Sequence, residues 1–192
     1  MKSCHHKSIR VCSKELQSFR TLDEIVTHYI VNHRQNIEDS LNFFKNLSFQ
    51  KSLEHAAFAK DQRCMRFSHQ RRVKKKSLQE SYKKLLEIER TLKESESFEN
   101  IFKIIQKVAS SIKGLGELYT YDTALRISAG LGYEPEFVYL HAGTRVGAKQ
   151  IRISVNSEYI ELKVLRKELL RLKAHEVEDL LCIYKNQLGA IL

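Results

Sequence analysis

Residues 98–127 read FENIFKIIQKVASSIKGLGELYTYDTALRI, and this stretch decides the fold class. From Phe98 to Ile112, apolar side chains recur at the three- and four-residue spacing of one helix face. The pattern stops at Lys113-Gly114, because glycine adopts the left-handed conformation that ends many helices without a steric cost. A second apolar helical pattern follows the G-L-G turn and starts near Leu125. The stretch therefore predicts two helices joined by a short glycine-bearing turn.

The distribution of glycine and proline extends this prediction to the whole chain. The 192 residues contain seven glycines and one proline, and the first glycine is Gly114. A β-sandwich needs turn residues about every 8 to 12 positions, which the long stretch before Gly114 does not supply in the usual way. We therefore expect an all-α protein: a flexible basic arm at 1–20, then a single helical domain over 21–192 whose glycine-bearing segment spans 113–149.

Capping signals and apolar periodicity predict the other helices. Thr21 and Ser77 each begin an S/T-x-x-E capping box, and Ser95 or Ser97 can cap the helix after it. We expect further helices near residues 37–44, 53–59, 165–172 and 177–184, the last ended by Gly189. Residues 151–155 alternate apolar and polar side chains, which allows one small β-hairpin with residues 159–162.

Positive charge is concentrated in one short segment. Lys and Arg number 33 against 23 Asp and Glu, and residues 60–76, KDQRCMRFSHQRRVKKK, hold much of the excess. A local basic cluster on an otherwise balanced chain is typical of a surface that binds a polyanion, most often nucleic acid. The alternative is a solvated loop that only aids solubility.

Side-chain chemistry selects candidate contacts for nucleic acid, with DNA favoured over RNA. Arginine binds phosphate through two hydrogen bonds, glutamine pairs with base edges, and the Phe67 ring can stack on an unpaired base. The candidates in the basic segment are Arg66, His69, Gln70, Arg71, Arg72, Lys74, Lys75 and Lys76. Those in the glycine-bearing segment are Lys113, Gly114, Gly116, Arg126, Thr144, Arg145 and Lys149.

The order helix, G-L-G, helix resembles the helix-hairpin-helix module, which binds the DNA backbone without reading its sequence. The resemblance implies that backbone amides after Gly114 and Gly116 hold a phosphate at the start of the second helix. It also implies that Ala124 permits close helix packing. Ala124 lies eight positions after Gly116, so the turn would carry an insertion at 118–121. A simple helix that ends at glycine and is followed by a loop is the alternative.

The segment FVYLHAGTRVGAK at 137–149 extends the resemblance to helix-hairpin-helix base-excision glycosylases. Val138 and His141 match the family's V-D-x-H, but Tyr139 occupies the place of the catalytic aspartate. The lysine of bifunctional members is replaced by residues of the stretch 117–119. Because both groups are missing, the resemblance implies the fold and DNA contact, and leaves open whether the chain is an enzyme.

Three side chains are candidates for proton transfer, namely Asp122, His69 and His141. His69 would need a carboxylate such as Asp122 or Glu117 within hydrogen-bond reach. Asp122 could polarise His141 or a water while arginines hold a phosphate, or it could simply cap a helix. A DNA-processing enzyme and a non-enzymatic protein that offers a basic face to an acidic partner are therefore the alternatives to a DNA-binding protein.

Other chemistries lack their motifs. The chain has neither G-x-x-x-x-G-K-[ST] nor G-x-S-x-G. Cys4, His5, His6 and Cys12 are zinc-ligand types, but adjacent ligands suit a tetrahedral site poorly, and we expect neither a metal nor a cofactor. No apolar run approaches about 18 residues, and the four cysteines are scattered, so we expect a cytoplasmic protein that does not enter a membrane.

Four short strings also resemble uncharacterised bacterial proteins of similar length, for which we know of no assigned activity. They are SHQRR (68–72), YDTALRI (121–127), LHAGTR (140–145) and EDLLCIYK (178–185). This second resemblance adds no mechanism.

Overall fold

Two long helices flank the glycine turn, as the sequence predicts. In the computed structural model, which describes residues 18–191, they are α6 (Phe98–Ser110) and α7 (Glu117–Leu131). Ser97 caps α6 by accepting a hydrogen bond from a backbone N–H in its first turn. The expected start of the second helix near Leu125 is wrong, because α7 begins directly after Gly116. The insertion expected at 118–121 is therefore the first part of α7 itself.

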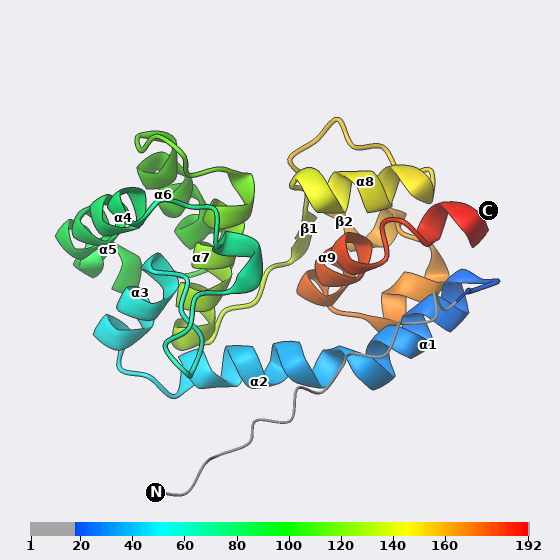
Figure 1. Ribbon diagram of the computed structural model, residues 1–192, viewed down its shortest axis with the longest axis horizontal. Coiled ribbons are helices and arrows are strands. Elements are labelled where there is room, and N and C mark those ends of the chain that lie inside the picture. The colour runs from blue at the N-terminus through cyan, green and yellow to red at the C-terminus, as the bar shows by residue number, and fades with distance from the viewer. Residues whose placement is uncertain (1–17, 192) are drawn as a thin grey trace, which may run out of the picture.

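The described residues form a mainly helical single domain with nine α-helices, four 3₁₀ helices and one two-stranded antiparallel sheet (Figure 1). The other α-helices are α1 (Leu22–Asn32), α2 (Arg34–Lys45), α3 (Phe49–Ala57), α4 (Lys75–Glu87), α5 (Glu89–Lys93), α8 (Ala142–Gln150) and α9 (Ala174–Ile183). The 3₁₀ helices are η1 (Ser68–Gln70), η2 (Leu162–Val164), η3 (Lys167–Arg171) and η4 (Leu188–Ile191). The all-α class is thus confirmed. Most of the basic arm expected at 1–20, with the four candidate zinc ligands, lies outside the described residues.

The small sheet is not the hairpin that the sequence allows. Strand β1 (Phe137–Tyr139) pairs with β2 (Tyr159–Glu161), and Val138 lies opposite Ile160. Residues 151–155 stay outside the sheet, since Arg152 adopts a positive φ of 60° that interrupts extended geometry. The strand partner is therefore the segment before α8, not the one after it.

Two large hydrophobic clusters form most of the core, and β1 joins them; a third, small cluster consists of Leu78, Ala109 and Tyr119. One cluster gathers apolar side chains of α1, α8, α9 and the sheet, and the other gathers those of α2 to α7 (Figure 1). Val138 belongs to the first cluster and Tyr139 to the second. Successive side chains of a strand point to opposite faces. A three-residue strand therefore contributes to both halves of the core.

Several helix ends differ from the predicted ones. Thr21 does cap α1, but Ser77 does not begin α4, which starts at Lys75. Ser77 lies in the first turn of α4, where its hydroxyl donates a hydrogen bond of 2.8 Å to the carbonyl oxygen of Lys113. The helix expected over 165–172 is the short 3₁₀ helix η3, and α9 ends well before Gly189. The bond from Ser77 ties the start of α4 to the glycine turn.

No helix among residues 18–191 has both the length and the apolar character needed to cross a membrane.

Candidate nucleic-acid interface

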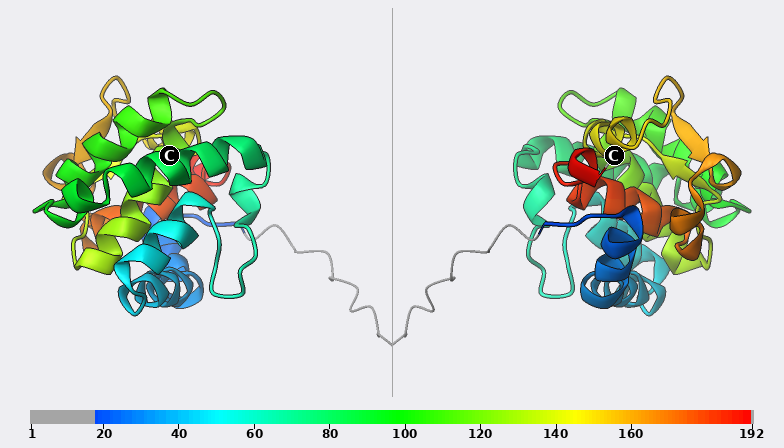
Figure 2. Two further views of the ribbon diagram at one scale, coloured as in Figure 1. Left: turned by 90° about the vertical axis from the view of Figure 1, so that its left-hand side faces the viewer. Right: turned by 90° about the vertical axis from the view of Figure 1, so that its right-hand side faces the viewer.

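A basic groove lies where the start of α4 meets the glycine turn. It has a volume of about 420 Å³, and its lining residues are Arg72, Lys74, Lys76, Ser77, Glu80, Lys113 and Gly114. Figure 2 shows the turn 111–116, the segment 68–76 and the loop 60–67 along one edge of the molecule. The structure thus brings the basic segment and the glycine-bearing segment, which are far apart in the sequence, to one site.

The backbone conformation of the turn explains why glycine occupies positions 114 and 116. Gly114 has a φ of +92°, in the left-handed region that side chains with a Cβ rarely adopt. Gly116 occupies the N-cap position of α7, and no side chain caps that helix. The first amides of a helix lack partners within the helix and point toward a ligand. The turn therefore combines a glycine backbone, which a ligand can approach closely, with the backbone N–H groups at the start of α7.

Asp122 is the centre of a polar network, not a helix cap, because it lies well inside α7. Its Oδ2 atom lies 2.7 Å from Nε2 of His69 and accepts hydrogen bonds from Gln70 at 2.8 Å and Arg126 at 3.1 Å. Burial acts to raise the pKa of Asp122, but the Arg126 charge and the bonds from His69 and Gln70 outweigh it and hold that pKa well below its usual range. The ionised carboxylate fixes η1 against α7.

Three of the candidate contacts for nucleic acid, Gln70, Arg126 and Thr144, are inside the protein. Gln70 is 2% exposed, and its amide is held by Asp122. Arg126 is 6% exposed, and its guanidinium carbon lies 4.0 Å from the centre of the Phe67 ring. Gln70 and Arg126 therefore support the basic segment from within. The neighbouring Arg71, Arg72, Lys74, Lys75 and Lys76 are all exposed.

His141 pairs with Glu178 and not with Asp122. The imidazole is buried at the N-cap of α8, where Nε2 contacts the Glu178 carboxylate and lies 2.9 Å from the Thr144 hydroxyl. Burial acts to lower the pKa of His141, and the hydrogen bond and charge of Glu178 outweigh it and raise that pKa. Thr144 is also fully buried, so this pair of candidates lies inside the protein.

The remaining candidates of the glycine-bearing segment have different surroundings. Arg145 donates hydrogen bonds to the carbonyl oxygens of Val155 and Ser157 and lies 3.4 Å from the Glu117 carboxylate. These bonds stabilise the loop between α8 and β2. Lys149 is exposed near the end of α8 and does not line the basic groove. In the basic segment, Arg66 is half-buried and donates to the carbonyl oxygen of Val73.

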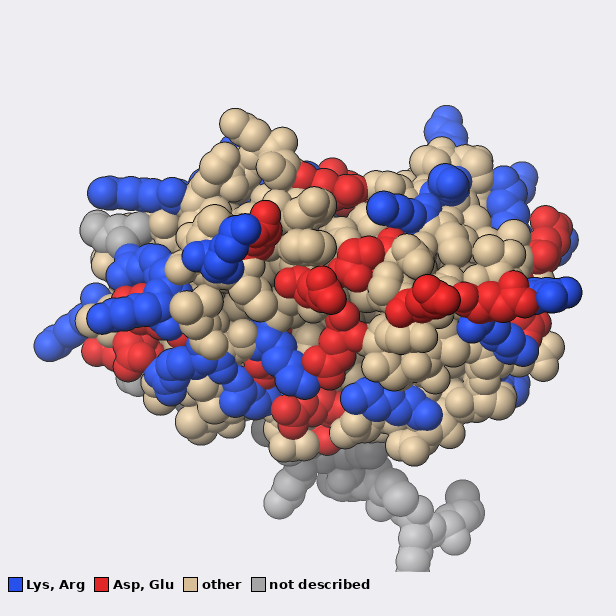
Figure 3. All heavy atoms as spheres, turned by 180° about the vertical axis from the view of Figure 1, so that it is seen from behind, with Lys and Arg blue, Asp and Glu red and all other residues tan. Residues whose placement is uncertain are grey.

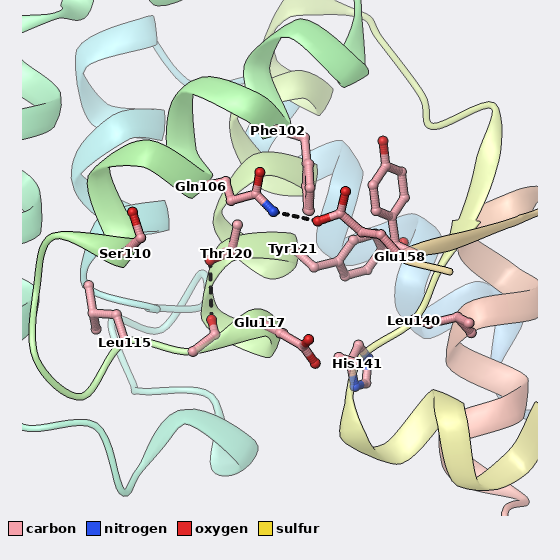
Figure 4. Close-up of a pocket in the computed structure, with 12 residues that line it drawn as sticks. Phe102, Gln106, Ser110, Leu115, Glu117, Thr120, Tyr121, Leu140, His141 and Glu158 are labelled. Carbon is pink, nitrogen blue, oxygen red and sulfur yellow. Dashed lines mark hydrogen bonds between the residues drawn. The ribbon is translucent and has the colours of Figure 1, made fainter. Parts of the chain in front are cut away.

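A second pocket, of about 180 Å³, lies on the other side of the turn (Figure 4). The rings of Phe102, Tyr121 and Tyr139 line it, together with a set of polar residues that includes Gln106, Glu117, Thr120, His141 and Glu158. Leu115 and Gly116 line this pocket, whereas Gly114 lines the basic groove. The glycine turn therefore separates the two sites.

Sequence reasoning missed the acidic partners in this half of the protein. Glu178 lies in the apolar pattern of α9 and contacts His141, and Glu158 follows a polar loop and contacts Gln106 from α6. A glutamate among apolar helix positions, as at Val177-Glu178, is the one signal that could have indicated a buried acid. No comparable signal marks Glu158.

The far side of the molecule from the view of Figure 1 has mixed charge. Figure 3 shows Asp and Glu side chains across the centre of that face, with Lys and Arg around them. A central group of carboxylates repels a polyanion. The edge that carries the basic groove is therefore the more favourable surface for one.

The resemblance to helix-hairpin-helix proteins rests on short motifs within residues 112–149. Among residues 18–191, no group of three or more His, Cys, Asp or Glu side chains is arranged to hold a metal ion. Comparison of the chain with models of known protein families, with curated proteins and with solved structures finds no match to any of them.

Proposed function

We propose that this protein binds the phosphate backbone of nucleic acid in the basic groove. One observation carries the proposal: four cationic side chains from two distant segments, Arg72, Lys74, Lys76 and Lys113, converge there beside Gly114. None of the four forms an ion pair within the part of the chain that the structure describes. Like charges that converge without acidic partners repel one another, and a polyanion relieves that repulsion.

The groove suits backbone contact better than base reading. Three of its four cations are lysines, which bind phosphate as point charges, and the one amide candidate, Gln70, is occupied by Asp122. Glu80 also lines the groove, but its carboxylate lies 3.9 Å from Lys84. Binding should therefore be largely independent of sequence. The likeness of the turn to helix-hairpin-helix modules favours DNA over RNA.

The salt dependence of binding tests the proposal. Each phosphate contact adds about 0.9 to the slope of log affinity against log salt concentration. Replacing Lys74, Lys76 and Lys113 together by Gln should lower the slope on duplex DNA by about 3. The matched control replaces three exposed lysines outside the groove, Lys83, Lys103 and Lys107, by Gln.

Two results would contradict the proposal. The first is DNA affinity that does not change with salt concentration. The second is an equal loss of slope in the control variant, which would show that net charge alone is responsible. A loss confined to the groove variant supports phosphate contact at this site.

The pocket beside the turn supports a second candidate function, a DNA-processing enzyme. Three aromatic rings line the pocket, and two carboxylates, Glu117 and Glu158, face it. Asp122 and His69 do not line it but His141 does, so the candidate groups for proton transfer are His141, Glu117 and Glu158. Incubation with damaged duplexes and single strands, with Glu117→Gln and Glu158→Gln as controls, tests this candidate. Absence of product from every substrate would exclude it for the lesions tried.

A further inference from the structure

We infer that His69 is a stacking platform for an unpaired nucleobase beside the basic groove, an inference that rests on the proposed function. Phe67, which the sequence marks for stacking, is already covered by two side chains. The Arg126 guanidinium lies 4.0 Å from the Phe67 ring centre, and the His69 ring lies 5.7 Å from it at an interplanar angle of 25°. His69 is the outer ring of this group.

The His69 ring is both fixed and open. Nε2 is held 2.7 Å from the Asp122 carboxylate, and one part of the ring contacts Phe67. Even so, 44% of the side chain is exposed to solvent. An exposed aromatic ring that is already fixed loses little conformational entropy when a ligand stacks on it. A base should therefore stack more favourably on the His69 ring than on a surface histidine that rotates freely.

The position of His69 connects it to the groove. His69 lies three residues before Arg72 and five before Lys74, and the segment 68–76 runs along the same edge as the turn 111–116 (Figure 2). A strand whose phosphates contact Arg72 and Lys74 thus passes close to the ring. Histidine is among the side chains on which splayed bases stack.

The chemistry identifies the ligand as a strand with at least one unpaired base. A base inside a duplex has both faces covered by its neighbours, so it offers no face to a side chain unless it leaves the stack. A single strand, a gap or a frayed end could each supply the base. We therefore expect His69 to add affinity for such strands and to add nothing for a fully paired duplex.

The experiment compares the full-length protein with three His69 variants. His69→Ala removes the ring, His69→Gln removes the ring but keeps a donor for Asp122, and His69→Phe keeps an aromatic ring. Thermal unfolding of each variant checks that it is folded. The probes are oligonucleotides of equal length that contain 2-aminopurine: a single strand, a duplex with one unpaired base, and a fully paired duplex. Affinity and the quenching of 2-aminopurine fluorescence are measured for each.

The expected result is selective for unpaired bases. Replacing one stacking side chain by alanine weakens binding by about 5- to 100-fold. His69→Ala and His69→Gln should show this loss, and reduced quenching, on both probes with unpaired bases, and His69→Phe should remain within about threefold of wild type. All three should bind the paired duplex like wild type. A difference between the single strand and the duplex with one unpaired base identifies the source of the base.

Other outcomes overturn the inference in distinguishable ways. If His69→Ala binds unpaired bases as tightly as wild type, the inference fails, and the phosphate groove stands as long as the Lys74, Lys76 and Lys113 variant loses affinity. If His69→Ala weakens all probes equally, His69 only supports the segment, and stacking is excluded. If the wild-type protein binds none of the probes, the proposed function and this inference both fail.

Discussion

Nε2 of His69 lies 2.7 Å from the carboxylate of Asp122, although 53 residues separate them in the chain. An ionised carboxylate only accepts hydrogen bonds, so Nε2 of His69 carries the proton in this contact. The same oxygen also accepts from Gln70 and Arg126. Asp122 thus holds the basic segment on α7 through two of its residues, His69 and the buried Gln70, and the Gln70 bond remains when His69 is replaced.

Replacement of Asp122 by Asn should therefore destabilise the protein strongly. Asp122→Asn leaves the buried Arg126 without its opposite charge, and loss of one partner of a buried ion pair costs about 3–5 kcal/mol. The free energy of unfolding in urea at pH 7 measures this loss. Asp39→Asn, at an exposed aspartate of α2, is the matched control and should change stability by less than about 0.5 kcal/mol.

The effect of Asp122→Asn should also depend on pH. The folded state lowers the pKa of Asp122 below its unfolded value of about 3.9. The charged carboxylate therefore contributes its full stability above about pH 5, and loses it as the pH falls through the folded pKa. Urea unfolding at intervals between pH 7 and pH 3 should show the gap between wild type and Asp122→Asn narrowing toward acid. A gap that stays constant would mean that the charge is not the cause.

Much of the fold follows from local sequence signals. Ser97 and Thr21 cap the helices that they are predicted to cap, because a cap depends only on residues three positions apart. The start of α7 is different. Tyr119, Tyr121 and Ala124 are buried on several sides of the helix, so no single apolar face marks its first turns. Periodicity identifies a helix only where one face meets solvent.

The site depends on contacts that the sequence does not encode locally. The types of residue in the basic segment and the turn indicate phosphate binding, but not that Lys113 meets Arg72 in one groove. The pairing of β1 with β2 is similar, since about 20 residues that include α8 separate the two strands. Such contacts form because apolar faces of distant elements pack together, and no short motif records which faces meet.

Asp179 should give the opposite pH dependence from Asp122. Burial, with the nearby Glu178 carboxylate, raises the pKa of Asp179 to about 7. An unfolded aspartate titrates near 3.9, so between about pH 4 and pH 7 the unfolded chain loses a proton that the folded protein keeps. This group therefore favours the folded state most below about pH 4, and its contribution is lost as the pH rises to about 7.

The variant Asp179→Asn tests this sign directly. The amide no longer titrates, and its oxygen can still accept the hydrogen bond from the Tyr29 hydroxyl, which is 3.1 Å long in the wild type. We expect wild type and variant to be equally stable at pH 4, and the variant to be more stable by on the order of 4 kcal/mol at pH 8. Urea unfolding at the two pH values measures the difference. A variant that is less stable at pH 8 would show that Asp179 is charged and stabilising in the folded protein.

Gly114 and Gly132 form a matched pair for separating stability from binding. Both have positive φ, +92° and +84°, so alanine at either position should cost about 1–2 kcal/mol of stability. Only Gly114 lines the basic groove. We expect Gly114→Ala to weaken binding of duplex DNA and Gly132→Ala to leave it unchanged, as measured by fluorescence anisotropy at fixed salt. Equal effects on binding would place the role of Gly114 in folding alone.

The contact between α8 and α9 should be the packing position least tolerant of an added carbon. A Cβ at Gly147 would lie 2.1 Å from the backbone oxygen of Leu181, which cannot move without shifting α9. Overpacking of this kind costs about 3 kcal/mol, which corresponds to about 6–12 °C in Tm for a chain of this length. A Cβ at Gly116 meets no heavy atom within 4 Å, so Gly116→Ala should lower Tm far less.

The displacement of α9 in Gly147→Ala should also be visible at His141. Because α9 carries Glu178, the displacement should break the contact between Glu178 and His141 and change the His141 imidazole resonance in NMR. A Tm and a resonance that both match wild type would mean that α8 and α9 do not approach as closely as the structure shows.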